Sequence, residues 1–321
     1  MKILITGGAG FIGSNFIRMM LIKYPDYEFI NLDKLTYAGN IENMSDIGCK
    51  SNYRFIKGDI CDFELMANIT RSVDVVFHFA AESHVDNSIK DPAIFTRTNV
   101  LGTHALLEAS RINSVKRFIH ISTDEVYGSI KEGSFREEDM LRPNSPYSAS
   151  KAAADMIARA YHMTYGFPVI ITRSSNNYGP YQHPEKLMPL FITNLIEDKK
   201  VPLYGKGENI RDWIYVRDNC EGIEYVWRRG ECGELYNIGG HNEMSNIDIT
   251  NILLKETGKD KCYIENVEDR LGHDFRYSLD CSKIMKLGWK PRYCFDDAIK
   301  ETVKWYSENQ AWWKKIKGAY L

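Results

Sequence analysis

The stretch KILITGGAGFIGSNFIRMMLIKY, residues 2–24, decides the fold of this chain. Its apolar start, KILIT, leads directly into Gly7, Gly10 and Gly13 at GxxGxxG spacing, and a helical composition follows. The pattern predicts a strand, a glycine turn and a helix. Such a turn lets the backbone approach a diphosphate, whose charge the N–H groups at the helix start can bind. We therefore expect a dinucleotide-binding unit.

The next strand, EFINLD at residues 28–33, indicates which dinucleotide is bound. It ends in Asp33, twenty residues beyond Gly13. A carboxylate there can accept hydrogen bonds from the adenosine ribose and repels a 2′-phosphate, so NAD is favoured over NADP. The neighbouring Lys34 weakens this preference slightly. The alternative is that Asp33 is a solvated turn residue.

Strands and helices continue to alternate after this unit. Strand patterns lie at 53–59, 74–81 and 117–123, with helical stretches near 62–71 and 92–112. Alternation predicts an α/β protein with a Rossmann-type, doubly wound parallel sheet, whose ligands lie beyond the carboxyl ends of the strands. The residues at the ends of those strands are Asp59, Ile60, Ala80, Ala81, Glu82, Ser83, Ser122, Thr123, Asp124 and Glu125.

Composition limits the classes of function. The 321 residues suffice for two lobes, and 41 basic against 43 acidic residues leave a net charge of -2, which gives no electrostatic reason to bind nucleic acid or a membrane. No apolar run approaches a membrane span, so we expect a soluble, cytoplasmic protein. The seven cysteines contain no CxxC pair and the eight histidines no HxH or HExxH spacing, so we expect neither disulfides nor a metal site.

Tyr147 and Lys151 are candidates for chemistry. They lie four residues apart in SPYSASKAAADMIARAYHMTYG, which has a helical composition and would place both side chains on one face. The ammonium group and a positive nicotinamide ring would favour the phenolate, which could take a proton from a sugar hydroxyl. The alternative is an ordinary YxxxK pair on a helix surface.

Taken together, these motifs resemble the extended short-chain dehydrogenase/reductase superfamily and, within it, the dTDP-glucose 4,6-dehydratases. The resemblance covers essentially the whole chain. The segments that carry it are GGAGFIGSN (7–15), DKLTYAGN (33–40), FAAESHVDNS (79–88), STDEVYG (122–128), PYSASKAAAD (146–155), RSSNNYGPYQHPEKLMP (173–189), RDWIYVRD (211–218), YNIGG (236–240) and DRLGHDFRY (269–277). The family usually has proline where Leu271 stands.

The resemblance implies a reaction on the sugar of dTDP-glucose. Tyr147 would deprotonate the C4 hydroxyl while NAD takes the C4 hydride, and Glu125 would then remove the acidified C5 proton. A protonated Asp124 would release the C6 hydroxyl as water, after which hydride returns to C6. Thr123 would polarise the C4 oxygen, and Lys151 would also hold the nicotinamide ribose. The alternative for the two carboxylates is a surface pair, and the loop must bend for both to reach one sugar.

The resemblance also implies two sets of binding residues. Those for NAD are Gly7, Gly10, Phe11, Ile12, Gly13, Asp33, Lys34, Leu35, Thr36, Asp59, Ile60, Phe79, Ala80, Ala81, Ser83, Thr98, Tyr147, Lys151 and Asn177. Those for the sugar nucleotide are Ser83, Thr123, Asn176, Lys186, Leu187, Pro202, Tyr204, Arg211, Asn246, Arg270 and His273. Arg211 is the strongest candidate on physical grounds, because its planar fork can hold a diphosphate through two hydrogen bonds.

The second half is predicted to form a smaller, mixed α/β substrate lobe. We expect residues 1–175 to form the NAD-binding domain, with returning segments near 211–240 that include RDWIYV and LYNIGG. Residues 176–210 and 241–321 would mainly form the substrate-binding domain. Helices 92–112 and 146–165 contain the small and apolar residues of a pairing surface, and the resemblance implies a homodimer.

Other functions remain possible at this point. A UDP-glucose 4,6-dehydratase or a sugar-nucleotide 4-epimerase would share most of these motifs, although an epimerase does not need Asp124 and Glu125. A catalytically idle NAD-binding protein is the alternative from outside the enzymes.

Overall fold

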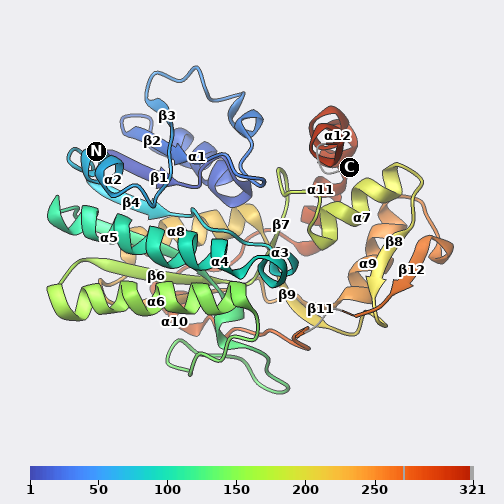
Figure 1. Ribbon diagram of the computed structural model, residues 1–321. Coiled ribbons are helices and arrows are strands. Elements are labelled where there is room, and N and C mark those ends of the chain that lie inside the picture. The colour runs from blue at the N-terminus through green and yellow to red at the C-terminus, as the bar shows by residue number, and fades with distance from the viewer. Residues whose placement is uncertain (270–271, 319–321) are drawn as a thin grey trace.

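The computed structural model describes residues 1–269 and 272–318, and a seven-stranded parallel sheet is its central feature (Figure 1). The strand order is β10-β6-β5-β4-β1-β2-β3, and every pairing in it is parallel. The doubly wound sheet predicted from the sequence is confirmed. Its strands are β1 (Lys2–Thr6), β2 (Glu28–Asp33), β3 (Tyr53–Lys57), β4 (Val75–His78), β5 (Arg117–Thr123), β6 (Val169–Ser174) and β10 (Leu235–Ile238).

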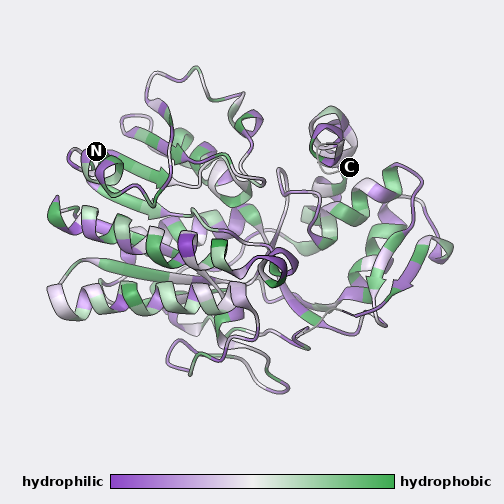
Figure 2. Cartoon of the chain, viewed as in Figure 1, coloured by the Kyte–Doolittle hydropathy of each residue, from purple (hydrophilic) through white to green (hydrophobic). Residues whose placement is uncertain are grey.

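Apolar side chains alternate between two cores, one on each face of this sheet. In β1, Ile3 and Ile5 belong to one buried cluster, whereas Leu4 belongs to the other. The alternation follows from the two-residue period of a strand, and Figure 2 shows the strands as largely hydrophobic. The helices beside the sheet are α1 (Phe11–Lys23), α2 (Phe63–Thr70), α5 (Thr103–Ile112), α6 (Pro146–Tyr165), α8 (Val216–Arg229) and α10 (Ser282–Leu287).

The helical stretch expected at 92–112 is continuous, but its helix type changes along its length. It consists of α4 (Pro92–Phe95), the π-helical η2 (Thr96–Gly102) and α5. Within η2, Asn99 is buried, accepts a hydrogen bond from the Glu82 N–H and donates one to the Glu82 carbonyl oxygen. The π turn thereby ties this helix to the segment that follows β4, a use typical of such turns near functional sites. The short helices α3 (Val85–Lys90), η1 (Ile41–Met44), η3 (Asp124–Tyr127) and η4 (Lys261–Tyr263) lie in the connections.

The second half of the chain builds two smaller sheets. β9 (Ile210–Tyr215) lies between β7 (Asn176–Tyr178) and β11 (Glu243–Ser245), and β8 (Val201–Tyr204) pairs with β12 (Ile264–Val267). Figure 1 shows α7, α9, β8 and β12 grouped beside the large sheet. The helices of this half are α7 (Leu187–Ile196), α9 (Asn246–Glu256), α11 (Phe295–Glu308) and α12 (Gln310–Gly318).

The two strands expected to return toward the first domain behave differently. β10, from LYNIGG, pairs with β6 in the large sheet, but β9, from RDWIYV, pairs only with β7 and β11. β6 is paired on both edges, with β5 and β10, and β9 does not join the large sheet. The residue bounds of the two domains stay a prediction. None of the helices described here has the length and apolar composition needed to cross a membrane.

Candidate active site

The glycine turn forms the floor of a cavity of about 230 Å³ at the carboxyl end of the sheet. Gly7 has a φ of +72°, and a Cβ atom there would lie 2.5 Å from the Ala80 backbone nitrogen. A Cβ on Gly13 would lie 2.4 Å from the Gly7 carbonyl oxygen. Only glycine fits either position. The turn is therefore packed as closely as a backbone site for a diphosphate requires.

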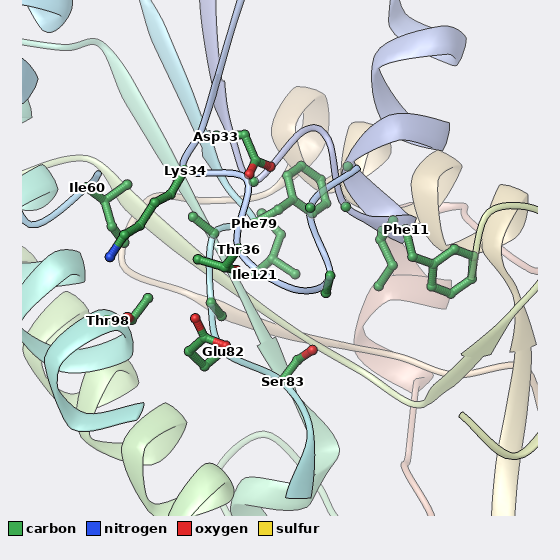
Figure 3. A pocket seen from close by; sticks show the side chains of 18 of the residues that line it. Phe11, Asp33, Lys34, Thr36, Ile60, Phe79, Glu82, Ser83, Thr98 and Ile121 are labelled. Carbon is green, nitrogen blue, oxygen red and sulfur yellow. The ribbon is translucent and has the colours of Figure 1, made fainter. Parts of the chain in front are cut away.

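Asp33 is the last residue of β2 and lines this cavity (Figure 3). Its two carboxylate oxygens accept hydrogen bonds from the Leu35 and Ala9 N–H groups at 2.8 and 2.9 Å. Burial raises the pKa of Asp33, and these two N–H groups oppose that change. Lys34 forms a 2.8 Å ion pair with Asp59. The Lys34 ammonium is therefore engaged by Asp59, and Asp33 keeps the position expected of a ribose acceptor.

Most of the predicted coenzyme residues line this one cavity. Leu35 and Asn177 are not among its lining residues. Leu35 has a φ of +58°. Asn177 lies on β7, where its side-chain amide donates a hydrogen bond to the Ser175 backbone carbonyl oxygen. The predicted residues that do line it are Gly7, Gly10, Phe11, Ile12, Gly13, Asp33, Lys34, Thr36, Asp59, Ile60, Phe79, Ala80, Ala81, Ser83, Thr98, Tyr147 and Lys151.

The chain bends directly after β5, as the chemistry of a carboxylate pair requires. Thr123 is followed by the 3-10 helix η3, and its hydroxyl accepts a hydrogen bond from the Glu125 N–H at 3.3 Å. The Thr123 hydroxyl donates to Asp124 at 3.1 Å. Glu125 lines a second cavity, whereas Asp124 is buried behind it and lines neither. Burial and the charge of Glu125 raise the pKa of Asp124 well above its usual range. This shift favours the protonated form of Asp124, the form that a general acid needs.

Tyr147 and Lys151 occupy one face of α6, whose start is fixed by a capping box between Ser145 and Ser148. The Lys151 ammonium donates to the Ile121 carbonyl oxygen at 2.7 Å. Burial lowers the pKa of Lys151 to about 8. Burial and the charge of Glu125 raise the pKa of Tyr147, and its hydrogen bond with Thr123 opposes the change. The lowering of the Tyr147 pKa expected from Lys151 together with a bound nicotinamide ring stays a prediction.

The second cavity, of about 180 Å³, adjoins the first through Glu185 and Lys186, which line both. Arg211 lies in it, with its guanidinium held by the Asp274 carbonyl oxygen at 2.9 Å and stacked 4.2 Å over the Tyr277 ring. Predicted substrate residues that line it are Asn176, Lys186, Leu187, Pro202, Tyr204, Arg211, Asn246 and His273. Of the others, Ser83 lines the first cavity, Thr123 lines neither, and Arg270 is outside the described residues.

Sequence reasoning missed Glu185, although it stands at the junction of the two cavities. Its carboxylate oxygens lie 3.8 Å from a His183 nitrogen and 3.9 Å from a His84 nitrogen. Burial raises the pKa of Glu185, and Lys186 opposes the change. In the sequence, Glu185 directly precedes the predicted substrate residue Lys186, and this position could have pointed to it.

Comparisons with known proteins agree with this geometry. The family model described as GDP-mannose 4,6 dehydratase matches residues 4–302. A dTDP-glucose 4,6-dehydratase from Streptomyces niveus is 50% identical over 99% of this chain and 96% of its own length. The solved structure of DesIV, a dTDP-glucose 4,6-dehydratase from Streptomyces venezuelae with NAD and TYD bound, superposes with a TM-score of 0.97. It is 53% identical and covers 98% of this chain and 100% of that one.

This chain belongs to the dTDP-glucose 4,6-dehydratase family. The family predicted from the sequence motifs is thereby confirmed. The fold is also shared with enzymes of other activity: a UDP-glucose 4-epimerase from Thermus thermophilus, solved with NAD, has a TM-score of 0.89 at 30% identity, covering 96% of this chain and 100% of that one. Membership of the dehydratase family therefore depends on the sequence relatives and on the residues of the site more than on the fold.

Proposed function

We propose that this chain converts dTDP-glucose to dTDP-4-keto-6-deoxyglucose and water, a step that supplies deoxysugar biosynthesis such as that of rhamnose. The observation that carries the proposal is that two cavities adjoin and that each is lined by a side chain able to transfer a proton. Tyr147 faces the cavity with the glycine turn, and Glu125 faces the cavity with Arg211. A hexose between them would meet a phenol and a carboxylate together, and the buried acid Asp124 follows Thr123 at the same bend.

NAD fits the first cavity by two observations. Gly7 and Gly13 have no room for a Cβ atom, and Asp33 stands at the carboxyl end of β2 where a ribose acceptor is expected. The N–H groups at the start of α1 would hold the diphosphate, and Lys151 would hold the nicotinamide ribose. When bound, NAD supplies a hydride acceptor for C4 and the hydride donor for C6.

The protein's own groups divide the proton transfers. Tyr147 takes the proton of the C4 hydroxyl, and Thr123 holds the C4 oxygen. Oxidation of C4 to a ketone makes the C5 proton acidic, and Glu125 removes it. Asp124, whose pKa is raised by burial and by Glu125, gives its proton to the departing C6 hydroxyl. Glu125 then returns a proton to C5. The proton that Tyr147 gained is released to solvent and Asp124 takes one up, so each group ends in its starting state.

Arg211 supports a diphosphate substrate. Its guanidinium is buried and pinned by backbone carbonyl oxygens, so its direction is fixed before a ligand arrives. A fixed guanidinium loses little side-chain entropy when it binds two phosphate oxygens. Lys186, whose ammonium donates to the Ser83 carbonyl oxygen at 2.8 Å, adds positive charge at the junction of the cavities.

The test of the function is to mix the purified protein with dTDP-glucose and, separately, with UDP-glucose, and to follow product mass without stoichiometric added NAD. We expect loss of one water from dTDP-glucose, faster than from UDP-glucose. The two bases differ by one methyl group, worth about 1–3 kcal/mol in a pocket. Faster loss from UDP-glucose would favour a UDP-glucose 4,6-dehydratase. Epimerised sugar of unchanged mass would favour a 4-epimerase instead.

We also propose that the chain works as a cytoplasmic homodimer. All seven cysteines are free thiols, which suits a reducing compartment. Along η2 and α6, Leu101, Met156, Met163 and Tyr165 expose 57, 49, 65 and 56% of their surface. Exposed apolar groups on adjacent helices favour pairing of two copies.

Light scattering should give twice the chain mass, and the double variant Leu101→Glu, Met156→Glu should give the mass of the monomer. A monomeric wild type would refute the dimer.

A further inference from the structure

The segment at residues 36–44 forms one wall of the coenzyme cavity. Thr36 and Gly39 line that cavity, and the segment ends in the 3-10 helix η1. A Cβ atom on Gly39 would lie 2.7 Å from a carboxylate oxygen of Asp33, so the segment lies directly against the proposed ribose acceptor. We call residues 36–44 the cover segment. Its position relative to the glycine turn decides how tightly the cavity encloses a coenzyme.

Two hydrogen bonds attach the cover segment to the glycine turn. The Asn40 N–H donates to the Ala9 carbonyl oxygen at 3.0 Å, and the Asn43 side-chain amide donates to the same oxygen at 2.8 Å. Ala9 in turn donates its N–H to Asp33 at 2.9 Å. Asn43 is 1% exposed. The orientation of its amide therefore decides whether the second of these bonds forms.

The C-terminal helix α12 fixes that orientation. The Trp312 indole N–H donates to the Asn43 side-chain oxygen at 2.8 Å, which leaves the amide nitrogen directed at Ala9. An indole N–H can only donate, so it selects the oxygen end of the amide. Next to this contact, Lys315 of α12 forms an exposed ion pair with Glu42 of the cover segment. Figure 1 shows α12, in red, between this part of the chain and α7.

Helix α12 is itself anchored away from the coenzyme. Trp313 is fully buried and its indole N–H donates to the Tyr306 carbonyl oxygen at 2.7 Å. Lys317 reaches α7 and its C-cap, where its ammonium donates to Asn194 and Glu197 at 2.9 Å each. The contact with Asn43 thus comes from a helix fixed to the second half of the chain.

We propose that α12 is a clamp that keeps the cover segment closed over the coenzyme, with Trp312 as the positioning residue that acts through Asn43. This inference rests on the proposed function, because it takes the first cavity to hold NAD. The clamp contributes to retention of the coenzyme. It touches neither the sugar nor the groups that transfer protons.

Trp312→Phe tests the clamp, because it removes the N–H and keeps an aromatic ring against Tyr181, whose ring centre lies 5.9 Å away. We expect exchange of bound, labelled NAD against excess unlabelled NAD to become about 5-fold faster, the factor that corresponds to one hydrogen bond of ~1 kcal/mol. Trp305→Phe is the matched control, because its ring lies 5.1 Å from that of Trp312 in the same cluster. Exchange at the wild-type rate in Trp312→Phe, or equal acceleration in Trp305→Phe, would overturn the proposal.

A double-variant cycle tests the route through Asn43. In a background of Asn43→Ala, Trp312→Phe should not accelerate NAD exchange further, because the partner of its hydrogen bond is already gone. A full additional acceleration would overturn the assigned route. Hydrogen exchange of the backbone amides at 36–44, measured without coenzyme, should also be faster in Trp312→Phe. That measurement tests the clamp even if the wild type binds no NAD, a result that would refute the proposed function.

Discussion

Tyr147→Phe should lower kcat for dehydration of dTDP-glucose by about 10²–10⁴-fold, the usual contribution of a positioned acid or base. The substitution removes one oxygen from a side chain that is 8% exposed and lies against Phe95 with a ring-centre distance of 6.3 Å. The packing of the ring is therefore preserved. We expect equilibrium binding of NAD and of dTDP to stay near wild type, because the lost group acts on the C4 hydroxyl.

The control for this variant lies on the same helix. Tyr161→Phe also removes a phenol oxygen from α6, but that oxygen donates to Glu108 at 3.0 Å, away from both cavities. Stopped-flow absorbance of the reduced coenzyme would follow oxidation at C4 in both variants. Tyr161→Phe should oxidise the sugar at the wild-type rate. Retention of more than about a tenth of wild-type kcat by Tyr147→Phe would remove Tyr147 from its role as the base.

Local patterns in the sequence were sufficient for the coenzyme side of the site. The spacing of Gly7 and Gly13 and the place of Asp33 at a strand end depend on short stretches of chain, and the structure brings them to one cavity. Leu35 does not line that cavity, and the sequence does not reveal its positive φ. Composition alone also gave no sign of the π turn around Asn99, since its hydrogen bonds reach a distant strand end.

Features that depend on packing between distant segments could not be predicted. The pKa of Tyr147 follows from its burial and from Glu125, and the sequence reveals only its spacing from Lys151. The contact of Trp312 with Asn43 joins segments 269 positions apart. The pairings of β9 join Trp213 to Asn176 and Asp212 to Glu243, positions 37 and 31 residues apart. In each case the deciding partner lies far away in the chain.

Glu125→Gln should separate oxidation from elimination. The amide cannot accept the C5 proton, so we expect loss of water and exchange of the C5 proton with solvent to fall by about 10²–10⁴-fold. Binding of NAD should persist, because Glu125 lines the other cavity. Some oxidation at C4 should also persist, because the substitution removes a charge that raises the pKa of Tyr147. Mixing with dTDP-glucose in D₂O, followed by mass spectrometry and coenzyme absorbance, measures all of these steps.

Asp124→Asn is the comparison that tells the two carboxylates apart. Without a proton donor for the C6 hydroxyl, that variant should still exchange the C5 proton but should lose water slowly. Burial and the charge of Glu125 raise the pKa of Asp124, which favours its protonated form. The proposed roles, Asp124 as the acid and Glu125 as the base, follow this direction. Undiminished C5 exchange in Glu125→Gln together with lost exchange in Asp124→Asn would reverse this assignment.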